Sequence, residues 1–302
     1  MKAFITGGTG FVGTYLTDRL LKSGWNVSIT GRSGQSIHKD NSNLSIIACD
    51  TKEPGDWQQS VADADLIINL AGKNIFTLWR DKTKKEIKES RILTTRNIVE
   101  AIPKNSPVIF ISTSAGGYYG DRKDMVLKED ACAGEGFLAE LCQCWEYEAL
   151  QAEKKGVRTV IMRFGMVLGQ GGGALKMMVP SFRMFLGGSL GKGDNWVPWI
   201  HIDDLVSAIL YSVETKGIKG PLNFCTPYPV SHRTLIKAVA KALGRPAFFR
   251  LPSFLIKVVM GGLGKEILFS QRMTPESLIV SGFNFKFENI DYALMDLLDT
   301  RD

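Results

Sequence analysis

Three glycines near the N-terminus have the spacing of a phosphate-binding turn. They are Gly7, Gly10 and Gly13, in the segment AFITGGTGFVG. The first permits a tight turn, the second lets main-chain N–H groups approach a pyrophosphate, and the third lets a following helix pack closely on the preceding strand. The N-terminus of that helix adds free N–H groups and a partial positive charge, so an anion can bind without a cationic side chain. We therefore expect this segment to bind a dinucleotide.

The elements that should flank these glycines are those that a dinucleotide site needs. The apolar run over 3–5 predicts a buried strand, a helix is expected over about 14–23, and a second strand over 25–30. Three glycines alone would be a weak signal, but a strand before them and a helix after them make the pattern specific. This context favours cofactor binding over a purely structural glycine turn.

The end of the second strand predicts which cofactor binds. An NAD-preferring protein usually carries Asp or Glu there to hold the ribose 2′-hydroxyl, whereas this chain has Gly31, Arg32 and Ser33. A guanidinium can bind a 2′-phosphate through two parallel hydrogen bonds. We therefore expect NADP(H) rather than NAD(H). The alternative is that Arg32 is an ordinary solvated arginine in a chain with 37 Lys and Arg residues.

Apolar runs that alternate with helix-length segments predict the fold class. Further strands are expected over 44–49, 66–70, 108–112 and 159–164, and helices over 83–101 and 137–154. The expected fold is α/β: a doubly wound parallel-sheet Rossmann fold with a smaller C-terminal substrate lobe. We assign 1–168 to the NADP-binding domain, with 197–230 returning to it, and 169–196 and 231–302 to the lobe.

Composition excludes several classes of protein. The net charge is +6 over 302 residues, but the basic residues are dispersed, so nucleic-acid binding is not expected. Five cysteines lack the paired spacing of a zinc site and fit reduced thiols in a cytoplasm, so we expect a cytoplasmic protein without a metal. The apolar stretch over 254–260 is too short to span a membrane. The expected partner is a small-molecule substrate, and a homodimer is compatible with the sequence.

Several longer motifs carry a family resemblance. GGTGFVG, NLAG, SRILTTRN, STSAGGYYG and WIHIDDL resemble the extended short-chain dehydrogenase/reductases. FLAELCQCWE, RFGMVLGQGGGAL and the tail QRMTPESLIVSGFNFKF are similar to an atypical subgroup, the nucleoside-diphosphate-sugar epimerase family proteins. The resemblance covers nearly the whole chain.

The resemblance implies a cofactor site at matching positions. The residues implied to wrap the pyrophosphate are Thr9, Gly10, Phe11 and Val12. The residues implied to line a ribose are Leu70, Ala71 and Gly72. Arg32 matches a 2′-phosphate position and Asp50 the adenine edge, and Val167 should touch the nicotinamide side. Arg91 lies where extended members often place an Asn facing the cofactor, with Glu86 as its candidate partner; the alternative is a surface ion pair.

The resemblance fails at the position where active members carry their catalytic pair. These enzymes use Tyr-x-x-x-Lys on the helix after the fifth strand, so that the lysine charge lowers the pKa of the tyrosine. The matching residues here are Phe137 and Leu141, and neither can carry a proton. By location, Ser114 and Tyr119 are the candidate catalytic residues. The alternative for Tyr118 and Tyr119 is packing, one beneath the cofactor and the other closing a pocket.

Three other side chains stand out near the glycine-rich segment. His201 in the motif WIHIDDL is expected to be a neutral, hydrogen-bonded residue that braces the loop of Asp203. Trp196 and Trp199 could form an apolar wall for a ligand or simply pack in the core.

Two functions remain open at this stage. One is an NADP(H)-dependent oxidoreductase or epimerase that acts on a small carbonyl or sugar-like substrate. The other is an NADP(H)-binding sensor or regulatory protein with little or no turnover, which the missing Tyr and Lys favour. The glycine-rich loops, the two tryptophans and the complete second lobe favour the enzyme.

Overall fold

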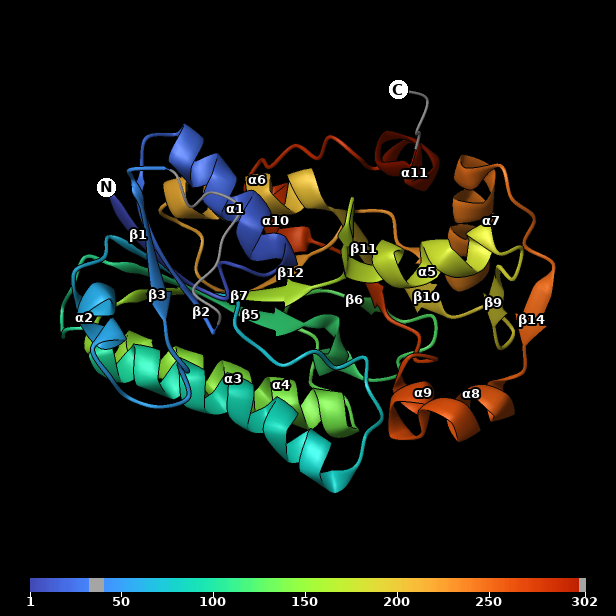
Figure 1. Ribbon diagram of the computed structural model, residues 1–302, viewed down its shortest axis with the longest axis horizontal. Coiled ribbons are helices and arrows are strands. Elements are labelled where there is room, and N and C mark those ends of the chain that lie inside the picture. The colour runs from blue at the N-terminus through green and yellow to red at the C-terminus, as the bar shows by residue number, and fades with distance from the viewer. Residues whose placement is uncertain (33–40, 299–302) are drawn as a thin grey trace.

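The fold is built on a seven-stranded parallel sheet, seen near the centre of Figure 1 in this computed structural model, which describes residues 1–32 and 41–298. The strand order is β12-β7-β5-β4-β1-β2-β3. The strands are β1 (Lys2–Thr6), β2 (Asn26–Gly31), β3 (Leu44–Ala48), β4 (Leu66–Asn69), β5 (Ile109–Ala115), β7 (Arg158–Phe164) and β12 (Gly220–Phe224). The order reverses between β1 and β4, and ligands of such sheets bind at the carboxyl ends of the strands at this switch point.

Helices cover both faces of the sheet. On one face, α3 (Asp81–Ala101) and α4 (Phe137–Leu150) lie side by side, with the short α2 (Trp57–Ala62) next to α3. On the other face, α1 (Phe11–Lys22) packs against α6 (Ile202–Glu214). Two 3-10 turns follow β5 and α4, at Gly116–Tyr119 and Gln151–Lys155. The helical layers explain why the strands are apolar on both sides: all four residues of β4 are buried.

The alternation of side chains along the strands divides the core into two layers. Ala3 and Ile5 of β1 belong to the larger hydrophobic cluster, on the side of α1 and α6. Phe4, between them, belongs to a second cluster with Trp57 and Ile98, on the side of α2 and α3. This period of two is the geometry of a strand buried on both faces.

The remaining elements form the C-terminal lobe and its connections. They are β6 (Val126–Leu127), β8 (Met166–Gly169), α5 (Gly173–Arg183), β9 (Gly188–Leu190), β10 (Trp196–Val197), β11 (Trp199–His201), β13 (Val230–Ser231), α7 (His232–Leu243), β14 (Phe249–Leu251), α8 (Ser253–Met260), α9 (Gly262–Glu266), β15 (Arg272–Met273), α10 (Glu276–Val280) and α11 (Ile290–Leu298). Residues of α7 and α11 share the larger core cluster with β1 and α1, so sheet and lobe have one continuous core.

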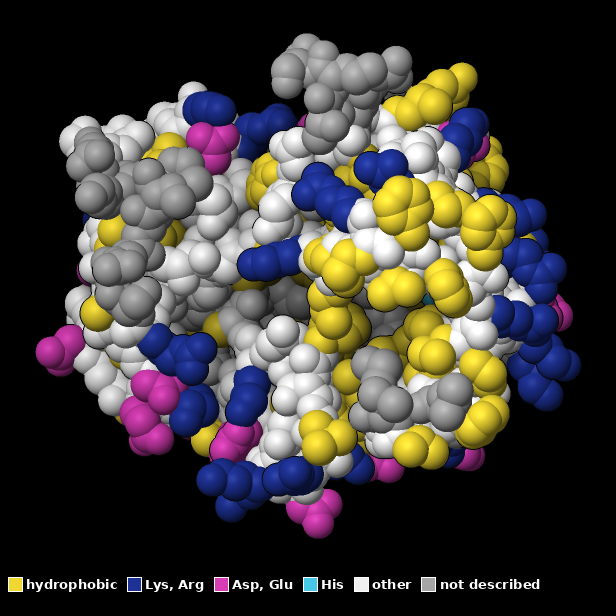
Figure 2. All heavy atoms as spheres, turned by 45° about the vertical axis from the view of Figure 1, so that its right-hand side comes forward, with side chains coloured by type: hydrophobic (Ala, Val, Ile, Leu, Met, Phe, Trp, Pro, Cys, Tyr) yellow, Lys and Arg dark blue, Asp and Glu magenta, His cyan; other side chains and the backbone are white. Residues whose placement is uncertain are grey.

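Figure 2 shows a hollow between the sheet and the lobe, with hydrophobic side chains gathered on the lobe beside it. Large apolar side chains of the lobe are exposed around the end of α5, β14 and α8, among them Phe185, Phe249 and Phe254. Within residues 1–32 and 41–298, no helix is long and apolar enough to cross a membrane, and no group of three His, Cys, Asp or Glu residues could hold a metal ion.

The expected fold class is confirmed, but the observed elements differ from the expected ones at several boundaries, and three of these places concern the site. The first helix begins at Phe11 rather than near 14, because Gly10 is extended and caps it. β5 continues through Ala115, so Ser114 lies within a strand and not in the loop after it. Val167 follows the expected strand over 159–164, and it lies in a separate short strand, β8, which pairs with β11.

Candidate functional site

The glycine turn lies between β1 and α1, at the switch point of the sheet. Gly7 has a φ of +70°, and a Cβ there would lie 3.0 Å from the carbonyl carbon of Leu70 at the end of β4. A Cβ on Gly13 would lie 2.3 Å from the carbonyl oxygen of Gly7, closer than any side chain can come. As expected, the turn is glycine-rich because two backbones and a helix meet there.

The start of α1 presents free backbone donors. Gly10 donates its N–H to the Gly7 carbonyl at 2.9 Å, and Thr14 donates to the Gly10 carbonyl at 2.9 Å. The N–H groups of Phe11, Val12 and Gly13 make no hydrogen bond within the described residues, and no side chain there caps the helix. Three parallel donors at the positive end of a helix form an anion site.

The ring of Phe11 holds a second glycine segment over this turn. A Cβ on Gly169, Gly172 or Gly173 would lie 2.6, 2.1 or 2.8 Å from the ring of Phe11. Tyr15 meets the same ring edge-to-face and donates to the Gln170 carbonyl at 3.3 Å. The loop of 169–173 is therefore glycine-rich because it closes on an aromatic ring. Phe11 contributes its backbone to the anion site and its side chain to this packing.

The end of β2 is shaped by Gly31, which precedes the exposed Arg32. A Cβ on Gly31 would lie 2.8 Å from the side chain of Thr9, so the residue at the usual acidic position is small enough for Thr9 to pack against it. Asp50, after β3, forms an ion pair of 3.2 Å with Lys52. The part of the β2–β3 connection that follows Arg32, including Ser33, lies outside the described residues.

The segment after β4, which the resemblance implies lines a ribose, is held by Arg91. A Cβ on Gly72 would lie 2.9 Å from the guanidinium carbon of Arg91. The same arginine donates from Nη1 to the Lys73 carbonyl at 3.0 Å, and its guanidinium carbon lies 5.1 Å from the centre of the Trp145 ring. Burial lowers the pKa of Arg91 to about 10. The segment 70–72 thus follows the carboxyl end of β4, and the guanidinium of Arg91 packs against it at Gly72.

The expected partnership between Glu86 and Arg91 is wrong. Glu86 instead accepts from the ammonium of Lys73, and this contact is the main reason why its pKa is lowered. Both side chains are more than a third exposed, so the pair is weakly stabilising. The cause is helical geometry: residues five apart on α3 point in different directions, whereas Lys73 lies above Glu86 on the neighbouring loop.

Sequence reasoning missed a buried polar network around Asn69, the last residue of β4. Thr6 donates to the Asn69 side chain at 2.7 Å, and Asn69 donates to Thr95 at 2.8 Å and to Ser112 at 3.2 Å. The indole of Trp145 also donates to Thr95 at 2.9 Å. These bonds fix the carboxyl ends of β1 and β4 and the middle of β5 relative to α3 and α4. The signal available in the sequence was the polar residue that ends β1 and β4.

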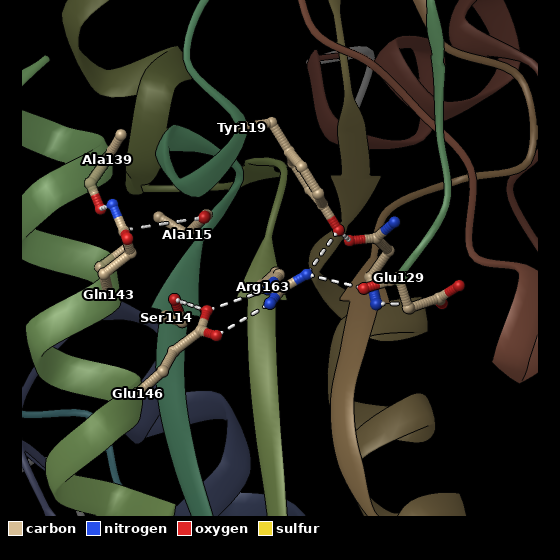
Figure 3. Close-up of polar contacts among 10 residues, drawn as sticks. Ser114, Ala115, Tyr119, Glu129, Ala139, Gln143, Glu146 and Arg163 are labelled. Atoms are coloured by element: carbon tan, nitrogen blue, oxygen red, sulfur yellow. Dashed lines mark hydrogen bonds and ion pairs between the residues drawn. The ribbon is translucent and has the colours of Figure 1, made fainter. Parts of the chain in front are cut away.

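The two candidate catalytic residues belong to a buried network shown in Figure 3. Ser114 donates to Glu146 at 2.6 Å, and Glu146 pairs with Arg163 through two hydrogen bonds of 2.8 and 2.9 Å. Arg163 also donates to the hydroxyl of Tyr119, which donates to Asn223 at 2.8 Å. Sequence reasoning did not single out Glu146, Arg163 or Asn223.

Burial decides between the two roles considered for Tyr119. Its side chain is fully buried, and desolvation raises the pKa of its hydroxyl. Ser114 is 1% exposed. The guanidinium of Arg163 lies 3.6 Å from the centre of the Tyr118 ring, so both tyrosines pack around this arginine. The geometry favours the packing role over proton donation for both tyrosines.

The positions of the missing Tyr and Lys are filled by an apolar cluster. Phe137 meets Trp79 edge-to-face at 5.0 Å, and Leu141 is buried with Trp79, Ile87 and Leu263. The carboxylate of Glu266 in α9 accepts from the backbone N–H of Phe137 at 2.9 Å. A carboxylate at this helix N-terminus is favourable, and it fixes the start of α4 to the C-terminal lobe.

His201 braces the start of α6 as expected. Its Nδ1 accepts from the N–H of Asp203 at 3.1 Å, and burial lowers its pKa, so the ring is neutral near pH 7. Trp199 is fully buried, so it packs in the core and does not form a wall for a ligand. Trp196 is only partly buried, and Arg272 lies 4.6 Å from the centre of its ring.

A parallel doubly wound sheet with a glycine turn and free helix amides at its switch point defines a Rossmann-type dinucleotide-binding fold. The chain belongs to the NAD dependent epimerase/dehydratase family, whose model matches residues 3–241. A second family model, a domain of unknown function (DUF1731), matches residues 251–297. The chain is thus an atypical extended short-chain dehydrogenase/reductase, as its motifs indicated.

Individual relatives are similar over the full length. The epimerase family protein YfhF of Bacillus subtilis is 36% identical over 304 residues, covering 100% of this chain and 99% of the relative. A chloroplastic SDR39U1 homologue of Arabidopsis thaliana is 35% identical over 302 residues, and the match covers 99% of this chain and 87% of the homologue. The crystal structure of the human epimerase family protein SDR39U1 with NADPH is 29% identical, with a TM-score of 0.85 over 99% of this chain and 100% of that chain.

Proposed function

We propose that this protein binds NADP(H) and uses it as an oxidoreductase or epimerase on a small carbonyl or nucleotide-sugar-like substrate. The observation that carries cofactor binding is the row of free N–H groups on Phe11, Val12 and Gly13 at the switch point of the sheet. The human relative, which was crystallised with NADPH, supports the same cofactor. When bound, the nicotinamide supplies hydride transfer.

The preference for NADP(H) is proposed from the end of β2. Gly31 leaves no carboxylate beside the ribose, and Arg32 is exposed and available for a 2′-phosphate. Calorimetry with NADPH and NADH should show a clear preference for NADPH in the wild type. Arg32→Asp should remove a charge-assisted contact and add a repulsive charge, weakening NADPH about a hundredfold while sparing NADH. Equal NADPH affinity in both proteins would contradict the assignment.

A second candidate function is an NADP(H)-binding sensor or regulatory protein. It is favoured by the apolar side chains at Phe137 and Leu141 and by the burial of Ser114 and Tyr119, because none of these four side chains is an accessible proton donor. The hollow beside the lobe favours an enzyme, because a sensor does not need space for a substrate next to its cofactor.

Two measurements separate the candidates. The first follows NADPH absorbance with a panel of carbonyl compounds and nucleotide sugars; oxidation favours the enzyme, and silence despite tight NADPH binding favours the sensor. The second uses Phe137→Tyr combined with Leu141→Lys, which restores the usual proton-transfer pair. If only that variant is active, the substrate site is intact but the wild type lacks the acid that the reaction needs. An inactive wild type favours the sensor.

A further inference from the structure

The C-terminal lobe exposes a patch of large apolar side chains. Six residues from three parts of the lobe define this apolar patch. They are Phe185 and Leu186 after α5, Phe248 and Phe249 at the start of β14, and Phe254 and Val258 in α8. Their exposed fractions range from 54% to 87%. A monomeric soluble protein rarely exposes many large apolar side chains together, and such a patch marks a site of interaction.

Backbone contacts join the three parts of the apolar patch. The N–H of Phe249 donates to the carbonyl of Gly187, the residue directly after Leu186, and β14 pairs with β9 so that Phe249 lies beside Gly188. Only Pro252 separates β14 from α8. Figure 2 shows hydrophobic side chains gathered on the lobe, with Lys and Arg side chains around them. The patch is therefore one continuous surface.

The segments that carry the apolar patch are basic. Residues 176–192 and 245–265 contain seven Lys or Arg residues and no Asp or Glu. The guanidinium carbon of Arg245 lies 4.8 Å from the centre of the Phe185 ring. The acidic residues nearest to these segments along the chain have partners already: Asp194 pairs with Arg233 at 2.8 Å, and Glu266 accepts from the start of α4. These segments thus present positive charge beside the apolar side chains.

We propose that the apolar patch docks on the surface of an anionic lipid bilayer. Its Phe and Leu side chains enter the boundary between head groups and acyl chains, and the surrounding Lys and Arg contact anionic head groups. Helix α8 has eight residues, whereas a membrane span needs about 20, so the contact is with the surface and not across the bilayer.

Two other occupants fit the apolar patch less well. A second copy of this chain would bring an equal positive surface to the same contact, and the two surfaces would repel each other. A small ligand needs a pocket that encloses it, whereas Phe248 is 87% exposed.

The test is flotation of the purified protein with lipid vesicles, made of phosphatidylcholine alone or of phosphatidylcholine mixed equally with phosphatidylglycerol. The apolar variant combines Phe248→Ser with Phe254→Ser, and the charge variant combines Arg183→Gln with Arg245→Gln. We expect the wild type to bind anionic vesicles roughly tenfold or more tightly than neutral ones, and each variant to lose a similar factor. Added salt should weaken the wild type more than the charge variant, because salt screens exposed charges.

A matched control removes exposed apolar side chains from other parts of the surface. Tyr147→Ser combined with Val280→Ser changes residues that are 63% and 78% exposed, on α4 and α10. This control should bind vesicles like the wild type. Urea denaturation shows that each variant is folded. NADPH affinity, measured by calorimetry, should be the same in all variants, so this inference and the proposed function can fail separately.

The other outcomes would overturn the proposal. They are no binding of the wild type to anionic vesicles, equal binding to neutral and anionic vesicles, and a loss in only one of the two variants or equally in the control. If size-exclusion chromatography shows a dimer that only the apolar variant dissociates, and vesicles do not bind the wild type, the patch is covered by a second copy instead.

Discussion

A single buried arginine organises the interior between the sheet and the C-terminal lobe. The side chains of Arg163 and Glu146 are 3% and 6% exposed, and they meet in a two-pronged ion pair. Arg163 also donates to the backbone carbonyl of Glu129, whose carboxylate accepts from the N–H of Ser277 in α10. All three nitrogens of Arg163 and both carboxylate oxygens of Glu146 are hydrogen-bonded, so the desolvation of the pair is compensated. Neither partner can be removed alone without leaving a buried charge.

Glu146→Ala should therefore be strongly destabilising, because it leaves the Arg163 charge buried and unpaired. We expect the free energy of unfolding, measured by urea denaturation, to fall by about 3–5 kcal/mol. Glu148→Ala, on the same helix, removes the partner of the half-exposed Arg96 and should cost at most about 1 kcal/mol. Similar losses in the two variants would mean that burial of the Arg163 pair does not matter.

At the scale of elements, the turn between β1 and α1 separates glycines needed for folding from glycines needed for a ligand. Gly13 is enclosed by the backbone of Gly7 and Gly8, and a side chain there cannot be accommodated without moving the turn. A Cβ on Gly10 would be only 3.1 Å from the Gly7 carbonyl oxygen, with nothing else within 4 Å. Apart from this one contact, the space beside Gly10 is open, as a pyrophosphate bound at this turn would require.

We expect Gly10→Ala and Gly13→Ala to differ in what they lose. Gly10→Ala should weaken NADPH binding at least tenfold with a change in unfolding free energy below about 1 kcal/mol, because its methyl group enters the pyrophosphate space. Gly13→Ala should lose both binding and stability, as judged by calorimetry and urea denaturation. Gly217→Ala is the control, since a Cβ there contacts nothing within 4 Å. Normal NADPH affinity in Gly10→Ala would count against a phosphate site at this turn.

At the scale of the whole molecule, the C-terminal segment is tied to α6 on the sheet domain. Asp204 accepts from the backbone N–H groups of Lys286 and Phe287 at 2.9 and 2.8 Å, and the ring of Phe287 stacks on His201 at 3.8 Å. Asp296 of α11 lies 3.3 Å from Nε2 of His201. The segment 286–296 thus closes over the start of α6.

This junction should make stability depend on pH through His201. Burial lowers its pKa below the usual value of about 6.5, so the unfolded chain takes up the proton first. The stabilisation by the neutral ring is complete above that value and is lost as pH falls through the folded pKa. His201→Asn keeps an acceptor for the Asp203 N–H but cannot titrate. Between pH 7.5 and 5.5, the wild type should lose more unfolding free energy in urea than this variant; parallel losses would contradict the prediction.

The sequence by itself predicted the parts of the site that depend on local backbone geometry. The glycine spacing predicted the turn at Gly7 and Gly13, and the apolar runs predicted a parallel sheet, because strand length, period and positive φ are properties of short segments. The sequence also showed that Phe137 and Leu141 replace the catalytic Tyr and Lys, because this requires only the residue types at two positions of a motif.

Only the tertiary structure decided which polar side chains form hydrogen bonds and ion pairs with one another. Ser114 meets Glu146, 32 residues away, and Tyr119 meets Asn223, 104 residues away, and these contacts bury two candidate catalytic hydroxyls. Glu86 forms an ion pair with Lys73, and Arg91 has no carboxylate partner among the residues described. Such pairings depend on which strands and helices become neighbours. No local pattern encodes them, because the cost of burying a polar group is fixed by everything packed around it.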